Sequence, residues 1–369
     1  MKTRMLLNFI LIIIIYSVFS FYIAWNEWVW LHTAFGLEDK WIYGLLVGII
    51  SYSYIIGHFL KRVPLFKIIG SYWFGLFQYA ILFLPLANLV AFILVFAGLP
   101  TTSVIIWVGG AVLAAFVLLF SYGTYNAYSP VVRTFSIVIP KRINDRSHLK
   151  IAMASDMHFG RLSGLAHVRR LVREVNKLKP DIILLPGDII DDDPEPFLQK
   201  KMGDVLQRLS APLGVFGVLG NHEYYGGEIP RFLKEMERIG ISILLDQVIK
   251  VDNLFYLAGR KDKTDINRLS IENLLADMDP TLPLIMMDHQ PAEIKLAEKH
   301  HVDLLLSGHT HRGQMAPNHL ITRRIFELDW GYLQKNQLHT IVSSGFGFWG
   351  PPLRIGSRSE IIQIDITFS

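Results

Sequence analysis

The stretch 182–191, IILLPGDIID, decides the fold of this 369-residue chain. Its first five residues form an apolar run of strand length, which ends at Gly187-Asp188. A short apolar run bounded by a turn residue is typical of a buried strand in a parallel sheet. Polar side chains that follow such strands gather at one edge of the sheet, where α/β folds place their sites. We therefore expect an α/β fold with Asp188 at its functional edge.

Four further short motifs lie at or just after apolar, strand-like runs. In chain order the five motifs are Asp156-Met-His158, Gly187-Asp188-Ile-Ile-Asp191, Gly220-Asn221-His222-Glu223, Asp288-His289 and Gly308-His309-Thr-His311-Arg312. A single Asp-x-His arises easily by chance, but an ordered series of this kind does not. The series contains the carboxylate, amide and imidazole groups that are needed to bind two divalent metals side by side.

Strand-like and helical patterns alternate over the second half of the chain. We expect strands at 151–154, 182–186, 215–219, 284–287 and 302–306, and helices at 165–178, 195–209, 230–239 and 292–299. This alternation indicates a layered α/β fold. Further strands are expected at 241–252, 254–260, 338–343 and 360–366, without long helices between them. The sheet is therefore expected to be mixed, as two sheets packed face to face.

The first third of the chain is much more apolar. The whole chain is 51% hydrophobic with a mean hydropathy of +0.34, and no charged residue lies between Lys67 and Arg133. Four apolar segments, at 6–24, 41–60, 72–97 and 104–121, each reach the length of about 20 helical residues that spans a hydrocarbon core. A cleaved signal peptide is the alternative for the first segment, but no clean cleavage site follows it.

These patterns predict three parts of the chain. Residues 1–128 are expected to form a four-helix transmembrane anchor, residues 129–148 a linker, and residues 149–369 a globular domain of typical large-domain size. The span centres lack Asp, Glu, Lys and Arg, which favours an anchor over a transporter with a regulatory domain.

Basic residues are distributed unevenly between the loops. They precede the first span (Lys2, Arg4), separate the second from the third (Lys61, Arg62, Lys67) and follow the fourth (Arg133, Lys141, Arg142, Arg146). The other two loops are poor in basic residues. The positive-inside rule therefore predicts a multi-pass protein of the cell membrane with both termini and the globular domain in the cytoplasm.

Charge and cysteine content narrow the possible partners and sites. The net charge of +4 and the pI of about 9.0 reflect the basic flanks of the spans, and no basic run is interleaved with aromatic residues. We therefore expect the bilayer, and no nucleic-acid polymer, as a partner. The chain has no cysteine, which excludes disulfides and thiolate metal sites. Mixed nitrogen and oxygen ligands suit Mn, Fe, Zn or Co better than Ca or Mg.

Taken together, the five motifs resemble those of the calcineurin-like metallophosphoesterase superfamily, whose pattern is D-x-H, G-D-x-x-D, G-N-H-[DE], H and G-H-x-H. The resemblance extends from about Lys150 to the C-terminus. Within the superfamily the chain is most similar to bacterial membrane-associated phosphodiesterases, by residues 308–314 (GHTHRGQ) and 344–354 (SGFGFWGPPLR). The resemblance implies a four-layer αββα sandwich with a dinuclear metal site on its rim, preceded by the four-helix anchor.

The resemblance also implies a role for each motif residue. The first metal would be held by Asp156, His158, Asp188 and His311, and the second by Asp188, Asn221, His289 and His309, so that Asp188 bridges the two. His222 would not bind metal but would act as the catalytic acid near the leaving-group oxygen.

Some residues keep two interpretations. Asp191 either orients a ligand histidine or is a surface carboxylate in an acidic run. Glu223 has no assigned role beyond a salt bridge, and Arg312 is either a phosphate contact or a solvated charge. The aromatic residues Phe346, Phe348 and Trp349 either line a lipid or nucleoside pocket or belong to the core.

The resemblance implies a metallophosphoesterase, a hydrolase that acts on phosphoric ester bonds. Hydroxide bridging two metals would attack phosphorus in line, and His222 would protonate the leaving alkoxide. A phosphodiester or pyrophosphate is expected as the substrate: the anchor favours a lipid-linked one, and a soluble nucleotide is the main alternative. The alternative function is a non-catalytic membrane sensor or scaffold, against which the intact Asp188, Asn221 and His222 argue.

Overall fold

The computed structural model describes residues 2–60, 63–143 and 146–369. The chain separates into two compact units, Met1–Tyr122 and Gly123–Ser369. Lys61 and Arg62, which contribute to the charge bias between the predicted spans, lie outside the described residues.

Four long helices make up the N-terminal third: α1 (Lys2–Phe35), α2 (Lys40–Phe59), α3 (Pro64–Phe96) and α4 (Thr101–Tyr128). All four are long and apolar enough to cross a membrane, as predicted. Large apolar side chains are exposed along them, including Trp41 and Phe96 at 80% and 86%. In water such a surface is unfavourable, so the helices match a lipid environment. Three of the helices, α1, α3 and α4, are longer than their predicted spans, whereas α2 has the predicted length shifted by one residue. Helix α1 continues to Phe35 and ends where Gly36 adopts a positive φ of 69°.

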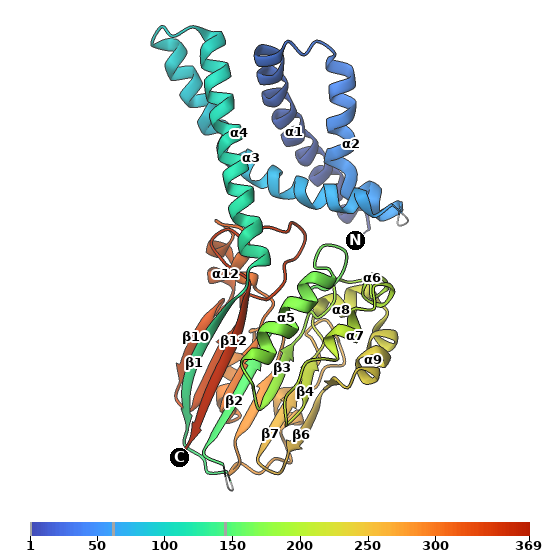
Figure 1. Ribbon diagram of the computed structural model, residues 1–369, viewed down its shortest axis with the longest axis vertical. Helices are drawn as coiled ribbons and strands as arrows, with labels where there is room; N and C mark the ends of the chain where they lie inside the picture. The colour runs from blue at the N-terminus through green and yellow to red at the C-terminus, as the bar shows by residue number, and fades with distance from the viewer. Residues whose placement is uncertain (1, 61–62, 144–145) are drawn as a thin grey trace. The chain divides into compact units, whose positions relative to one another are not determined.

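The second unit contains two six-stranded sheets in the described part of the chain (Figure 1). The first has the order β1-β12-β2-β3-β4-β5, with bounds β1 Val131–Ile139, β12 Glu360–Phe368, β2 His148–Met153, β3 Ile182–Pro186, β4 Val215–Val218 and β5 Ser242–Ile243. The second has the order β10-β11-β9-β8-β7-β6, with bounds β10 Gly331–Lys335, β11 Leu338–Val342, β9 Leu304–Ser307, β8 Leu284–Met287, β7 Phe255–Gly259 and β6 Gln247–Val251.

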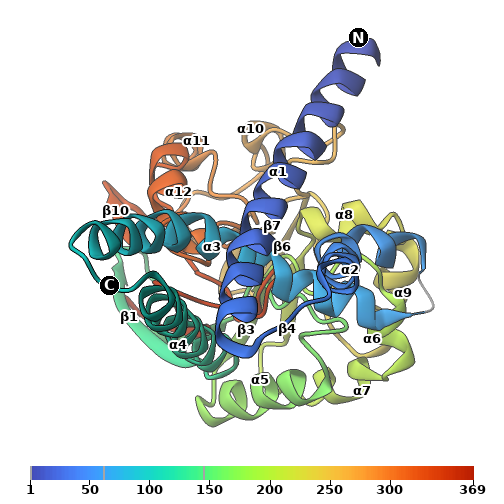
Figure 2. The ribbon, with the colours of Figure 1, turned by 90° about the horizontal axis from the view of Figure 1, so that it is seen from above.

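Most helices of this unit cover the outer faces of the two sheets, but α12 has no buried residue and belongs to neither cover. Their bounds are α5 Leu165–Lys177, α6 Glu195–Gln199, α7 Met202–Leu206, α8 Asn221–Gly226, α9 Ile229–Arg238, α10 Ile271–Leu274, α11 Ile294–Lys299, η1 His311–Gly313 and α12 His319–Ile325. Seen from above, α5 and α7 lie on one side of the unit and α10 and α11 on the other (Figure 2). This is the predicted four-layer αββα sandwich.

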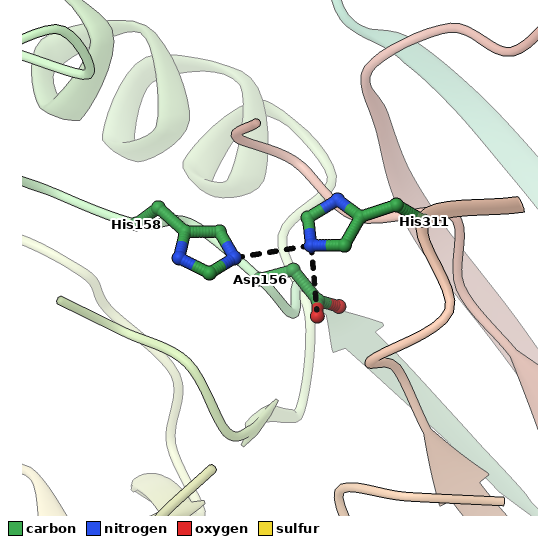
Figure 3. A group of neighbouring side chains, drawn as sticks. All are labelled: Asp156, His158 and His311. Atoms are coloured by element: carbon green, nitrogen blue, oxygen red, sulfur yellow. Dashed lines mark hydrogen bonds and ion pairs between the residues drawn. The ribbon is translucent and has the colours of Figure 1, made fainter. Parts of the chain in front are cut away.

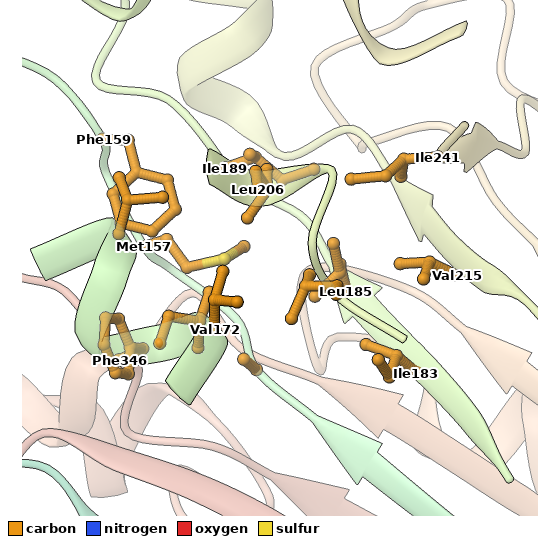
Figure 4. Close-up of a cluster of buried hydrophobic side chains, with 14 of the residues drawn as sticks. Met157, Phe159, Val172, Ile183, Leu185, Ile189, Leu206, Val215, Ile241 and Phe346 are labelled. Carbon is orange, nitrogen blue, oxygen red and sulfur yellow. The ribbon is translucent and has the colours of Figure 1, made fainter. Parts of the chain in front are cut away.

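Side-chain alternation along the strands explains the layers. In β3, Ile182 and Leu184 enter the core between the two sheets, whereas Ile183 and Leu185 pack under the helices that include α5 (Figure 4). Both faces of β3 are therefore buried, which accounts for its unbroken apolar run. A third core lies outside the second sheet, where Ile294 of α11 packs on Met286 of β8. Burial of each large apolar side chain contributes about 1.5–3 kcal/mol of folding free energy to this arrangement.

Three expectations need correction. The predicted linker at 129–148 contains β1, which pairs in parallel with β12 along its full length. The helix expected at 195–209 is broken into α6 and α7, because Lys201 adopts a left-handed conformation with φ 50°. The single strand expected at 241–252 is two strands, β5 and β6, which belong to different sheets. Each difference depends on long-range pairing or on a local backbone turn that periodicity does not show.

The topology brings the carboxyl ends of strands from both sheets to the same end of the sandwich. Strands β2, β3 and β4 run parallel in the first sheet, as do β8 and β9 in the second. The carboxyl ends of these five strands precede the five sequence motifs.

Candidate metal centre

The structure gathers the motif side chains from the carboxyl ends of five strands. Asp156 and His158 follow β2, Asp188 follows β3, Asn221 begins α8 after β4, His289 follows β8, and His309 and His311 follow β9. Because β2, β3 and β4 belong to one sheet and β8 and β9 to the other, the site needs both sheets to be packed together.

One group consists of Asp156, His158 and His311, each of which offers a ligand atom within 4.8 Å of the others (Figure 3). The Nε2 atoms of His158 and His311 are 3.0 Å apart, and His311 Nε2 is 3.5 Å from Asp156 Oδ1. All three side chains are buried. Two imidazole nitrogens and a carboxylate oxygen that face one another form a donor set for a divalent transition metal.

A second group consists of Asp188, His289 and His309, again with ligand atoms within 4.8 Å of one another. Asn221 joins it, since its Oδ1 is 3.1 Å from His289 Nε2 and 2.8 Å from His309 Nδ1. The two groups therefore contain the seven predicted ligands between them.

Asp188 lies between the groups. Its Oδ2 is 3.1 Å from His289 Nε2 in the second group and 3.7 Å from His158 Nε2 in the first. A carboxylate that approaches both sets is the geometry that a bridging ligand requires. The positions match the predicted ligand sets, and metal ligation itself stays a prediction.

The backbone around these residues is unusual. Asp156, His158, Asp188, His309 and His311 all have positive φ, between 44° and 71°. Such conformations cost about 1–3 kcal/mol each in non-glycine residues and gather at functional sites. The motif glycines make room for the same side chains: a Cβ on Gly187 would lie 2.5 Å from His289 Nδ1, and one on Gly308 would lie 2.2 Å from Asp156 Oδ2.

Hydrogen bonds orient the candidate ligands. His289 Nδ1 lies 2.9 Å from the Pro186 carbonyl oxygen, to which it donates, so Nε2 points at Asp188 and Asn221. Asp156 Oδ1 accepts a hydrogen bond from the His309 backbone N–H at 2.8 Å, and Asp188 Oδ1 accepts one from the His222 N–H at 3.0 Å. Outer contacts of this kind fix the direction of metal ligands.

Glu223 has a role that sequence reasoning missed. Its buried carboxylate accepts hydrogen bonds from the backbone N–H groups of Gly220, Asp188 and Ile190, at 2.7, 3.2 and 3.0 Å. It therefore clamps the loop after β3 to the loop after β4. The fourth position of the G-N-H-E motif marks this role, but the three backbone partners are visible only in the structure.

The charge states of the histidines suit metal binding. Burial lowers the pKa of His158 to about 3 and that of His309 to about 4, and it holds the pKa of His311 well below its ordinary value. These three rings are neutral at pH 7, so their lone pairs are available. His289 differs: burial opposes its charge, but the Asp188 carboxylate outweighs burial and holds its pKa well above the ordinary value. A metal at this nitrogen would displace a proton.

His222 lies beside the first group without belonging to either candidate ligand set. Its Nδ1 is 2.6 Å from Asp192 Oδ1, and its ring centre is 4.6 Å from that of His158. Burial opposes protonation, but the hydrogen bond to Asp192 and the charge of Asp188 raise the pKa of His222 to about 9. The imidazole is therefore a cation at neutral pH, with its second proton on Nε2.

Two carboxylates of the acidic run after β3 lie near histidines of the site. Asp191, expected to orient a ligand histidine, has its Oδ1 3.9 Å from His158 Nδ1, which is beyond hydrogen-bond length. The orienting role of Asp191 therefore stays a prediction, whereas Asp192, which sequence reasoning did not single out, holds His222. The acidic run in the sequence indicated that carboxylates follow β3. Residue spacing alone does not show which carboxylate contacts which histidine.

Other motif residues have structural contacts. Asp288 pairs with Arg260 at 2.8 Å and with Arg268, and so braces the loop that carries His289. The Arg312 guanidinium lies 4.0 Å from the centre of the Trp330 ring, and its contact with phosphate stays a prediction. Among the aromatic residues, Phe346 and Phe348 are buried in the core, whereas Trp349 is 56% exposed beside His222.

Comparisons with known proteins agree with the geometry. Residues 149–313 match the family described as calcineurin-like phosphoesterase. An uncharacterized metallophosphoesterase of Aquifex aeolicus is 33% identical over 258 residues, which cover 68% of this chain and 97% of that protein. A Bos taurus protein described as a transmembrane protein with metallophosphoesterase domain is 29% identical over 256 residues, which cover 64% of this chain and 57% of that protein.

An uncharacterized metallophosphoesterase of Helicobacter pylori is 35% identical over 225 residues, which cover 58% of this chain and 59% of that protein. The chain therefore spans nearly all of the Aquifex relative, but less than two thirds of the Helicobacter and Bos relatives.

Proposed function

The chain belongs to the calcineurin-like metallophosphoesterase family, and from that premise we propose that it is a membrane-anchored, metal-dependent phosphoesterase that hydrolyses phosphodiesters or pyrophosphates. One observation carries the proposal: seven nitrogen and oxygen donors from two sheets converge in two adjoining groups, with Asp188 between them. Members of this family typically use two divalent metals.

The donor set fits two such ions. Asp156, His158, Asp188 and His311 would hold the first, and Asp188, Asn221, His289 and His309 the second. The low pKa values of His158, His309 and His311 support this assignment, because buried neutral imidazoles beside carboxylates offer lone pairs to a cation. When bound, the metals would activate water at neutral pH and neutralise charge on the phosphoryl oxygens.

The chain's own residues supply the proton for the leaving group. His222 carries a proton on Nε2 because Nδ1 is occupied by Asp192. In this proposal it donates that proton to the departing oxygen, which would otherwise leave as an unstable alkoxide. Asp192 keeps the ring oriented and charged until the donation. Glu223 and Asp288 hold the ligand-bearing loops still.

The surroundings of His222 support a substrate with an apolar leaving group. The ring centres of Tyr225 and Trp349 lie 5.6 and 6.3 Å from that of His222, and both side chains are more than half exposed. The apolar helices suggest membrane association, and the charge bias favours a multi-pass protein with the Gly123–Ser369 unit in the cytoplasm as its catalytic domain. We therefore favour a lipid-linked phosphodiester or pyrophosphate over a soluble nucleotide.

The proposal is tested with the purified full chain. Hydrolysis of bis-p-nitrophenyl phosphate, phosphodiester lipids, lipid-linked pyrophosphates and nucleotides is measured with Mn, Fe, Zn or Co added. Asp188→Asn serves as the matched control, since it keeps the shape of the side chain and removes its charge. Metal-dependent hydrolysis above that control is expected for at least one substrate. If no substrate is hydrolysed above the control with any metal, the scaffold or sensor function replaces the enzyme.

A further inference from the structure

Helix α12 presents an apolar surface to solvent. Leu320 and Ile321 are each 60% exposed and Ile325 is 67% exposed, while Arg323 and Arg324 are exposed between them. Every residue of the helix is at least partly exposed. Single exposed apolar residues are common on proteins, but three on one short helix with two adjacent arginines form a patch that calls for a partner.

The exposure is built into the fold. Thr322 Oγ1 of α12 donates to Asp329 Oδ2 at 2.7 Å, and Thr310 Oγ1 donates to the Asp329 carbonyl oxygen at 2.5 Å. Asp329 thus ties α12 to the loop that carries His309 and His311. On the other side of that loop, a Cβ on Gly313 would lie 2.4 Å from the backbone nitrogen of His319, so the helix starts in close contact with η1. The apolar side chains are therefore held in place.

The position of α12 within its unit indicates the partner. Residues Gly123–Tyr128, the last turns of α4, belong to this unit. The Gly123 carbonyl accepts a hydrogen bond from Arg354 N at 2.9 Å, and the next residue, Ile355, accepts one from Ala316 N at 2.7 Å. Helix α12 begins three residues after Ala316. The segment that leads into α12 is therefore tied to the end of α4 through Arg354 and Ile355, and α12 lies at the end of this unit from which α4 leaves (Figure 1).

We propose that α12 docks on the surface of the bilayer that α4 crosses. Leu320, Ile321 and Ile325 enter the boundary between head groups and acyl chains, and Arg323 and Arg324 contact anionic phospholipid head groups. Two features favour a bilayer over another protein: the continuity with a candidate membrane span, and the arginines beside the apolar residues, which complement anionic lipid. The docking would turn the loop of His309 and His311 towards the membrane. The proposal does not depend on the proposed activity.

The absence of cysteine from the chain allows a direct test. Ile321→Cys is labelled with an environment-sensitive fluorophore, and the full chain is reconstituted in vesicles of phosphatidylcholine and phosphatidylglycerol. Val138→Cys is the matched control, because Val138 is 55% exposed near the far end of β1. We expect nitroxide-bearing lipids to quench the label at position 321 and not the label at position 138. Iodide in solution should quench the label at position 321 severalfold less than the label at position 138. A helix at this boundary lies about 5–10 Å deep.

Two further measurements separate the possible occupants of the patch. Replacing Arg323 and Arg324 by Gln should reduce the lipid quenching in anionic vesicles and leave it unchanged in neutral ones. Dilution to one protein per vesicle should leave the quenching intact. The proposal is overturned if iodide reaches positions 321 and 138 equally, or if protection disappears on dilution, which would mean that a second copy of the chain covers α12. The circular dichroism spectrum and melting temperature of each variant verify that it is folded.

Discussion

Replacing Asp192 by Asn should move the alkaline limit of activity to lower pH. Asp192 Oδ1 lies 2.6 Å from His222 Nδ1, and this hydrogen bond is the largest of the interactions that raise the His222 pKa from 6.5 to about 9. Asn keeps the shape and a hydrogen-bonding oxygen but removes the charge. A nearby opposite charge shifts a pKa by roughly 1–3 units, and because the Asp192 side chain is half exposed, we expect a fall of roughly 1–2 units.

The sign follows from the role of the group. As a general acid, His222 is active while protonated, so activity is present below its pKa and is lost as pH rises through it. A fall of the pKa from about 9 to roughly 7.5 would lower the protonated fraction by about fourfold at pH 8, but by less than about 1.5-fold at pH 7.

The assay is the pH dependence of kcat on a phosphodiester with a poor leaving group. Asp193→Asn is the matched control, because the Asp193 carboxylate accepts a hydrogen bond from the Glu195 backbone N–H, whereas the carboxylate on His222 is that of Asp192. Wild type and Asp193→Asn should share one alkaline limb. If Asp192→Asn keeps that limb as well while its metals stay bound, protonated His222 is not the acid and the reasoning fails.

Three other perturbations test the site and the topology. Asp188→Asn should remove both metals, whereas Asn221→Ala should weaken binding of the second metal only. Metal content is measured by mass spectrometry, and two metals retained in Asp188→Asn would exclude a bridging role for Asp188. His222→Ala should keep both metals and lower kcat by about 10²–10⁴-fold, with a smaller loss for p-nitrophenyl esters, which need less protonation; equal losses for good and poor leaving groups would mean that His222 positions phosphate. Reporter fusions after Ser129 should report the cytoplasmic side, and a signal from the opposite face would overturn the predicted orientation without affecting the enzyme class.

Local patterns in the sequence were sufficient to predict many of the strands, helices and site residues of this protein. Strands β3 and β8 have the predicted bounds, because each is a short apolar run buried on both faces and ended by a turn or a motif residue. The four long apolar segments predicted the N-terminal helices for a similar reason, since length and composition alone decide whether a helix suits a bilayer. The motif order predicted which seven side chains come together, because parallel strands place their ends on one edge.

Tertiary structure decided what depends on partners distant in sequence. Strand β1 forms only because β12, at the other end of the chain, offers an edge to pair with, so its residues resembled a linker. Asp192 reaches His222 whereas the neighbouring Asp191 lies nearer His158, because the loop after β3 turns the two carboxylates in different directions. The three N–H donors to Glu223 and the exposed apolar face of α12 are equally invisible to periodicity. Composition and hydrophobic periodicity show which residues of a single helix or strand are buried. The features above depend instead on the backbone geometry that several elements impose together.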